Sequence, residues 1–135
     1  MLSELRLENY AVIDNLAVEF AAGLNLLTGE TGAGKSILID ALALLLGEKA
    51  SSDVIRANAD RAVINAVFEV DQRTETSINK ILEANGIDPN EEDESIILRR
   101  EIAAGGKGRV FINNQPATVA VLRQLAPHLA TIHAE

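Results

Sequence analysis

The sequence predicts an α/β domain in which a mixed sheet with antiparallel hairpins surrounds the helix of a phosphate-binding loop. Two observations carry this prediction. A short apolar run at residues 24–27, which we expect to be a buried strand, leads into a glycine-rich loop, and an apolar helix follows at residues 35–46. Stretches that alternate apolar and polar residues, as half-buried strands do, lie on both sides of this unit.

The first 20 residues predict a β-hairpin. Leu5 and Leu7 alternate with polar residues, and the same alternation returns at Leu16 and Val18. Asp and Asn favour turns, so we place the turn of the hairpin at residues 14–15.

The helix at residues 35–46 is apolar nearly all round, so we expect it to be buried on most sides. Gly47 stands where a left-handed C-terminal cap belongs. We then expect a loop at residues 51–60, a strand at residues 64–70 with Asn65 and Glu69 facing outward, and a helix around residues 78–82 that ends near residues 85–86.

The last third of the chain predicts a second hairpin and a final helix. Strands are expected at residues 96–102 and 110–112, and the glycine-rich residues 104–108 join them. Thr118 is the expected N-cap of the last helix. The apolar face of that helix consists of Val121, Leu122 and Leu125.

Composition narrows the class of protein. The 135 residues suit one domain (residues 1–135), and 47% apolar residues suffice for a core. The absence of cysteine excludes disulfides and thiolate metal sites. No signal peptide or membrane span is visible, so we expect a cytoplasmic protein. A net charge of −8 argues against binding DNA by bulk electrostatics, although four basic residues cluster locally. These are Arg99, Arg100, Lys107 and Arg109.

Residues 29–36 match the phosphate-loop pattern G-x-x-x-x-G-K-[ST] in full. The glycines permit a close approach of the backbone, whose N–H groups hold phosphate oxygens at the start of the following helix. Lys35 is expected to reach the β- and γ-phosphates, and the Ser36 hydroxyl to bind Mg²⁺. The candidate ATP-binding residues are Gly29, Glu30, Thr31, Gly32, Ala33, Gly34, Lys35 and Ser36.

A hydrolytic site of this class also needs an acidic residue at the end of an apolar strand, to hold Mg²⁺ and orient water. Asp40 lies on the predicted phosphate-loop helix, and the stretch at residues 67–71 is interrupted by Glu69, so neither fits well. The chain alone therefore lacks a complete ATPase site. The alternatives are a small self-contained nucleotide kinase or other P-loop NTPase, and a scaffold with a vestigial loop. A kinase would need an arginine-rich lid that is not evident, and the intact Lys35 and Ser36 argue against a vestigial loop.

Beyond the loop, the sequence resembles the amino-terminal head of the RecN family of bacterial DNA repair proteins, which are SMC-like ATPases and relatives of the ABC ATPases. The resemblance is strongest at residues 23–47 and covers essentially the whole chain. The segments that carry it are residues 5–13, 23–36, 40–42, 44–47, 53–56, 98–100, 106–109 and 111–113, with Asn114 in place of a family glycine.

The resemblance implies a head assembled from both ends of a longer chain, with a long antiparallel coiled coil between them. The Walker B and signature motifs would belong to the C-terminal half, and two heads would close over two ATP molecules. It further implies a role in DNA double-strand break repair at the nucleoid, with DNA bound by the full-length protein. The family has a Mg²⁺-sensing glutamine at the position of Glu135. Because a glutamate stands there in this chain, Glu135 is a doubtful match for that role.

Other candidates compete with ordinary structural interpretations. Arg56 resembles an arginine that approaches nucleotide or DNA, but a solvated loop arginine is equally compatible with its position. Tyr10 could stack on adenine, although a half-buried hairpin residue is favoured. No metal site is expected at His128 or His133, and the acidic residues 91–94 are expected to form a solvated loop. We favour a plain hairpin tip over a phosphate site at residues 105–109.

Overall fold

The computed structural model describes residues 2–19, 32–89, 95–105 and 108–133, with side chains from residue 36 onward in the first helix and up to residue 129 in the last. Six strands form one sheet in the order β2-β1-β3-β4-β5-β6, and every pair of neighbours is antiparallel. The elements are β1 (Leu2–Tyr10), β2 (Ile13–Glu19), α1 (Gly32–Leu45), the 3-10 helix η2 (Ser52–Val54), β3 (Arg61–Glu69), α2 (Gln72–Ala84), β4 (Ser95–Ala103), β5 (Gly108–Ile112), β6 (Gln115–Ala117) and α3 (Val119–His133).

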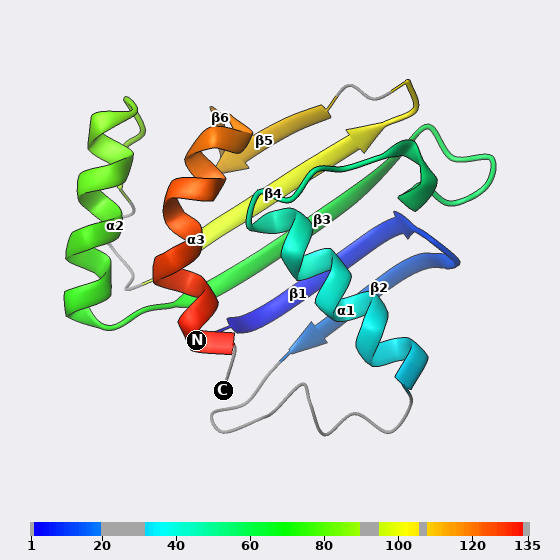
Figure 1. Ribbon diagram of the computed structural model, residues 1–135, viewed down its shortest axis with the longest axis horizontal. Helices are drawn as coiled ribbons and strands as arrows, with labels where there is room; N and C mark the ends of the chain where they lie inside the picture. Colours follow the sequence, from blue (N-terminus) through cyan, green and yellow to red (C-terminus); the bar gives the residue numbers. More distant parts are fainter. Residues whose placement is uncertain (1, 20–31, 90–94, 106–107, 134–135) are drawn as a thin grey trace.

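Helices α1 and α3 lie across one face of the sheet, and α2 packs beside α3 (Figure 1). Alternate residues of the strands supply the apolar surface beneath the helices, because successive side chains of a strand point to opposite faces. This covered face includes Leu5, Leu7, Ile64, Phe68 and Leu98, each at most 1% exposed. The opposite face, which we call the open face, carries exposed or half-buried residues such as Arg6, Asn65, Ile97 and Arg99. The α/β fold class predicted from the sequence is confirmed.

The first hairpin forms as predicted, but the predicted position of its turn is wrong. Asp14 lies inside β2 and not in the turn. The strand pair nearest the turn is Tyr10 with Ile13. The loop therefore consists of Ala11 and Val12. Ala11 adopts a φ of 54°, a left-handed conformation that tight hairpin loops require. Cross-strand pairing therefore continues past the Asp-Asn dipeptide to residue 13.

Several other predictions are confirmed. Gly47 has a φ of 103° and ends α1, and α2 ends at Ala84 as its spacing indicated. The Thr118 hydroxyl accepts a hydrogen bond from the Val121 N–H at the start of α3. The face of α3 formed by Val121, Leu122 and Leu125 is buried. Strand β6 was not predicted, because its three residues include a proline.

The helix α1 is less enclosed than its apolar sequence predicts. Its second half is buried, with Ala41 and Leu45 at 0% exposure. In its first half Ser36, Ile39 and Asp40 are exposed. The physical reason is that the sheet covers only one side of the helix. The predicted strand at residues 24–27, the acidic residues 91–94 and the tip of the glycine hairpin at residues 106–107 lie outside the described residues.

Candidate nucleotide-binding site

The phosphate-loop motif is joined directly to α1. Residues 29–31 lie outside the described part of the chain, and the backbone of residues 32–36 forms the first turn of the helix. The first turn contains no acidic side chain, so nothing on the helix itself neutralises the positive end of its dipole. Ser36 is exposed. This arrangement suits an anion such as a phosphate chain.

The other end of α1 is held by side chains from distant parts of the sequence. The helix has no basic residue in its last turn. Instead, Arg100 of β4 donates from Nη1 to the carbonyl oxygens of Leu44 and Glu48, both at 2.6 Å. Arg123 of α3 donates from Nε to the carbonyl oxygen of Gly47 at 3.0 Å. The Leu44 carbonyl, which also accepts from the Gly47 N–H, and two carbonyls just past the end of the helix are thereby bonded to cations, which favour the negative end of the dipole.

Arg100 is 7% exposed, an unusual position for a charged residue. Its burial lowers the pKa of its guanidinium, and the nearby positive charge of Arg123 lowers it further. A signal for this burial was present in the sequence, because Arg100 alternates with Leu98 and Ile102 along one face of β4. Grouping Arg100 with the other basic residues by sequence position alone did not reveal this burial.

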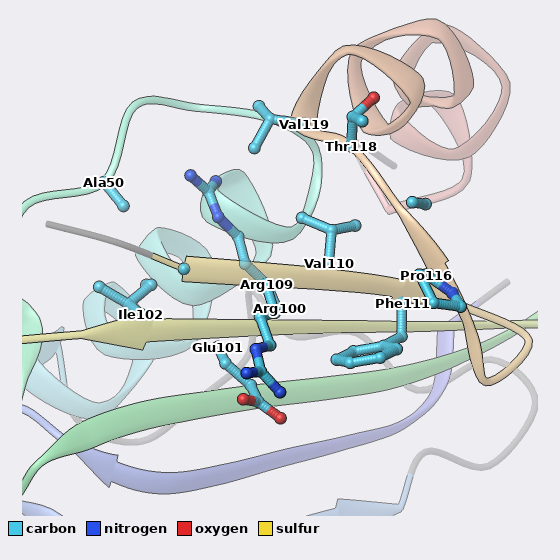
Figure 2. Close-up of a pocket in the computed structure, with 12 residues that line it drawn as sticks. Ala50, Arg100, Glu101, Ile102, Arg109, Val110, Phe111, Pro116, Thr118 and Val119 are labelled. Atoms are coloured by element: carbon cyan, nitrogen blue, oxygen red, sulfur yellow. The ribbon is translucent and has the colours of Figure 1, made fainter.

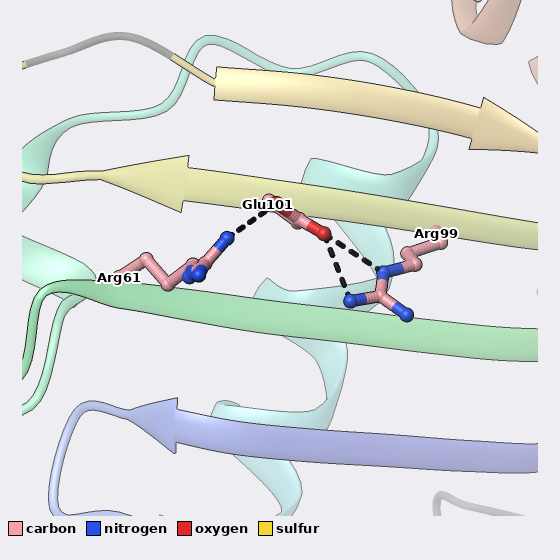
Figure 3. A network of polar contacts seen from close by, with 3 residues as sticks. All are labelled: Arg61, Arg99 and Glu101. Carbon is pink, nitrogen blue, oxygen red and sulfur yellow. Dashed lines mark hydrogen bonds and ion pairs between the residues drawn. The ribbon is translucent and has the colours of Figure 1, made fainter. Parts of the chain in front are cut away.

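The remaining members of that basic cluster lie elsewhere. Arg99 faces the open side of the sheet, where its Nη2 lies 2.8 Å from Oε2 of Glu101 (Figure 3). Arg61 of β3 binds the other carboxylate oxygen of Glu101 at 3.1 Å. The Arg99 guanidinium also lies 6.0 Å from the centre of the Phe111 ring. Arg109 is exposed, and its backbone lies opposite Glu101 in the register of β4 and β5. The described members of the cluster are therefore divided between the two faces of the sheet, and Lys107 lies outside the described residues.

A hollow of about 590 Å³ opens beside β5, between the start of α3 and the segment that follows α1 (Figure 2). Its lining includes Ala50, Arg100, Arg109, Phe111 and Thr118. Because Arg100 binds the carbonyl end of α1, the hollow lies at the end of that helix opposite the phosphate-loop motif. It is thus separate from the candidate nucleotide site, and no motif in the sequence indicated it.

Tyr10 is a core residue. It is 3% exposed and forms an isolated β-bridge with Ile55. Asn9 adopts a φ of 52°, which interrupts the alternation of β1 and allows Tyr10 to be buried. Burial raises the pKa of the Tyr10 hydroxyl, with a smaller contribution from the charge of Asp40. Its packing agrees with the structural interpretation rather than with stacking on a base.

Arg56 is placed beside the first hairpin. Its backbone N–H donates to the carbonyl oxygen of Asn9 at 2.8 Å. The side chain is 45% exposed, and its Nη1 lies 3.9 Å from a carboxylate oxygen of Asp14, which is 78% exposed. Such a long, solvated ion pair adds little stability and leaves the guanidinium accessible. A contact of Arg56 with nucleotide or DNA stays a prediction.

The weak acidic candidates have structural roles or positions. Asp40 is exposed on α1, and Glu69 is the last residue of β3. Asp71 caps α2, where its carboxylate accepts a hydrogen bond from the Thr74 N–H at 2.7 Å. That bond holds the pKa of Asp71 below its ordinary value. Across the residues that the structure describes, no three His, Cys, Asp or Glu side chains gather as a metal site would require. Glu135 lies outside that part.

Among the described helices, none combines the length and apolar character that a membrane span requires.

Sequence comparison places the chain among known proteins. Residues 4–126 match the protein family described as AAA domain. Over its whole length the chain is 39% identical to DNA repair protein RecN of Bacillus subtilis and 36% identical to RecN of Vibrio cholerae. The chain spans about a quarter of the length of these relatives, 23% and 24% respectively.

Solved structures agree on the fold. The SMC head domain from Thermotoga maritima superposes with a TM-score of 0.61 at 25% identity, covering 91% of this chain and 41% of that one. An SMC ATPase studied for ATP-driven dimerization and DNA stimulated activation gives a TM-score of 0.70 at 21% identity, covering 96% and 79%. The recombination mediator protein RecF, solved with ATP, gives 0.60 at 16% identity, covering 87% and 27%. The chain therefore belongs to the AAA domain family, as a relative of DNA repair protein RecN with the fold of an SMC-type ATPase head.

Proposed function

We propose that this chain is the ATP-binding, amino-terminal part of an SMC-like ATPase head that acts in recombinational repair of DNA double-strand breaks. The observation that carries the proposal is the position of the phosphate-loop motif at the start of α1, within the fold of an ATPase head. The family implies nucleotide binding, and ATP is the nucleotide bound to the structural neighbour RecF. The RecN relatives support the role in repair.

In this proposal residues 29–34 hold the phosphates with backbone N–H groups, and Lys35 contacts the β- and γ-phosphates. Ser36 supplies a hydroxyl for Mg²⁺, and its exposure on the first turns of α1 suits that role. The metal would neutralise phosphate charge when bound. Arg56 is a secondary candidate for contact with nucleotide or DNA, and Glu135 is a doubtful candidate for the Mg²⁺-sensing position.

The site as proposed is split between two parts of a longer protein. Residues 1–135 provide the phosphate loop, and a C-terminal half of the same head provides the Walker B and signature residues. A second head closes over the nucleotide, as supported by the ATP-driven dimerization of the SMC neighbour. DNA would be bound by the full-length protein, in the cytoplasm at the nucleoid.

Replacement of Lys35 by Ala tests the nucleotide site. We expect the wild-type full-length protein to bind Mg·ATP and the Lys35→Ala variant to lose at least about 100-fold in affinity, since a charge-assisted contact to phosphate is removed. Isothermal titration calorimetry measures both constants. Arg6→Ala removes the same charge from the open face of the sheet, opposite the face that α1 covers, and should leave binding unchanged. Equal affinities of the wild type and Lys35→Ala would refute the assignment.

A further inference from the structure

The two arginines at the carbonyl end of α1 connect the candidate nucleotide site to the centre of the sheet. Arg100 is flanked in the sheet by Ile64 of β3 and Val110 of β5, so its backbone is fixed on both sides. Its guanidinium binds the carbonyl oxygens of Leu44 and Glu48, which lie on either side of the point where the helix ends. One buried group therefore restrains both the sliding and the tilting of α1.

We propose that Arg100 is a positioning residue for nucleotide binding, which acts through α1 on the phosphate loop at the opposite end of that helix. This inference rests on the proposed function of residues 29–36. Arg100 fixes the axis of α1, and the rigid helix in turn sets where its first N–H groups point. Arg123, which holds Gly47, supports the same restraint from α3.

The action is mechanical rather than a direct effect of charge. A helix of 14 residues is about 21 Å long, at 1.5 Å per residue. Coulomb attraction falls with distance, so over that length the charge of Arg100 has only a weak direct effect on a phosphate at the far end. Displacement of a binding group by about 1 Å, in contrast, is costly for a site that depends on geometry.

The chain supplies a matched control in the next residue. Arg99 lies on the same strand and carries the same charge, but faces the open side of the sheet and pairs with Glu101. Arg99→Met and Arg100→Met therefore make the same chemical change one residue apart. Only the second removes hydrogen bonds to α1.

The test measures the dissociation constant for Mg·ATP in the full-length protein that carries this chain. The wild type is compared with Arg100→Met, Arg100→Lys and Arg99→Met, at a temperature where circular dichroism shows each to be folded. We expect binding about ten-fold weaker for Arg100→Met and within two-fold of wild type for Arg99→Met. Arg100→Lys should recover most of the affinity, because both bonds come from one nitrogen that an ammonium can replace.

A purely structural role for Arg100 gives a different result. If the role is purely structural, Arg100→Met has a lower melting temperature than wild type, but its folded form binds Mg·ATP with the affinity of wild type. This outcome overturns the inference. If Arg100→Met does not fold, Arg123→Met replaces it, with an expected weakening of about three-fold. Unchanged affinity in Arg123→Met then overturns the inference, whereas Arg100→Lys is expected to stay close to wild type in either case.

Lys35→Ala separates the two proposals. If the wild type binds nucleotide and Lys35→Ala does not, the nucleotide site stands and the Arg100 variants decide the inference alone. If neither binds, the proposed function fails and the inference fails with it.

Discussion

Arg99 and Arg100 are neighbours on β4, but the two faces of the sheet place them in different surroundings. The Arg99 side chain is 41% exposed and pairs with Glu101. Arg100 is buried and donates to backbone carbonyls of α1. An ion pair to an arginine that is this exposed contributes about 1 kcal/mol, since water competes for the guanidinium even though Glu101 is buried. A buried hydrogen bond from a charged group contributes about 1.5–3 kcal/mol, since little water is available to replace the lost donor.

The covered face of the sheet carries the apolar core and the hydrogen bonds to the end of α1, whereas the open face carries partly exposed arginines around the buried Glu101. Substitutions on the two faces should therefore differ in cost even where the residues are adjacent.

Truncation of an apolar residue should give the largest difference in the free energy of unfolding between the two faces. Leu98 is 0% exposed on the covered face, and Leu98→Ala should lower the free energy of unfolding by about 3 kcal/mol through lost burial and a cavity. The adjacent Ile97 is only half-buried on the open face, and Ile97→Ala should cost about 1 kcal/mol. Urea denaturation measures both values. Equal costs would show that the open face is covered as well.

Substitution of each arginine in turn should give a smaller difference in the free energy of unfolding between the two faces. Arg100→Met should lower the free energy of unfolding by about 2–3 kcal/mol, because two carbonyl bonds of α1 are lost. Arg99→Met should cost less than about 1 kcal/mol, because Glu101 keeps its ion pair with Arg61. The same denaturation series gives both numbers, and a larger loss for Arg99→Met would reverse the comparison.

Two glycines test how tightly the end of α1 is packed. Gly47 and Gly86 both have positive φ, so an alanine at either position costs about 1 kcal/mol in backbone strain. A Cβ at Gly47 would also lie 2.5 Å from Cγ of Arg123, whereas nothing lies within 4 Å of a Cβ at Gly86. Gly47→Ala should therefore cost about 1 kcal/mol more than Gly86→Ala. Thermal melts of both variants check the difference, and equal losses would mean that Arg123 moves aside freely.

Tyr10 gives the smallest effect, visible only at high pH. Its pKa is raised in the folded protein, so the unfolded chain loses the hydroxyl proton first, near pH 10. The folded state then binds more protons than the unfolded state, and stability falls as the pH rises above that value. Tyr10→Phe should show a shallower decline between pH 9 and about pH 11. Parallel declines in the two proteins would contradict the burial of this hydroxyl.

The sequence predicted most elements because their periodicities are clear. The alternation of β1 and β3, the cap at Gly47 and the N-cap at Thr118 all follow from local chemistry. The turn of the first hairpin was misplaced because cross-strand pairing outweighed a favourable Asp-Asn dipeptide. Rules that consider only neighbouring residues in the sequence cannot predict which of these two effects prevails.

The candidate site was predictable only in part. The phosphate-loop motif can be recognised from the sequence alone, because few other sites need glycines at that spacing followed by Lys-Ser. The restraint on α1 could not be read in the same way, because Arg100 is 56 residues from the Leu44 carbonyl that it binds. Strand alternation indicates that Arg100 is buried, but only the packed structure shows its partners.

The central claim is that residues 1–135 hold the triphosphate but cannot cleave it alone. Steady-state release of phosphate from Mg·ATP tests this most directly, in the 135-residue chain and in the full-length protein side by side. We expect turnover by the full-length protein, its loss in Lys35→Ala, and none by the shorter chain at any concentration. Robust hydrolysis or phosphoryl transfer by the 135 residues alone would contradict the split site and favour a self-contained P-loop enzyme.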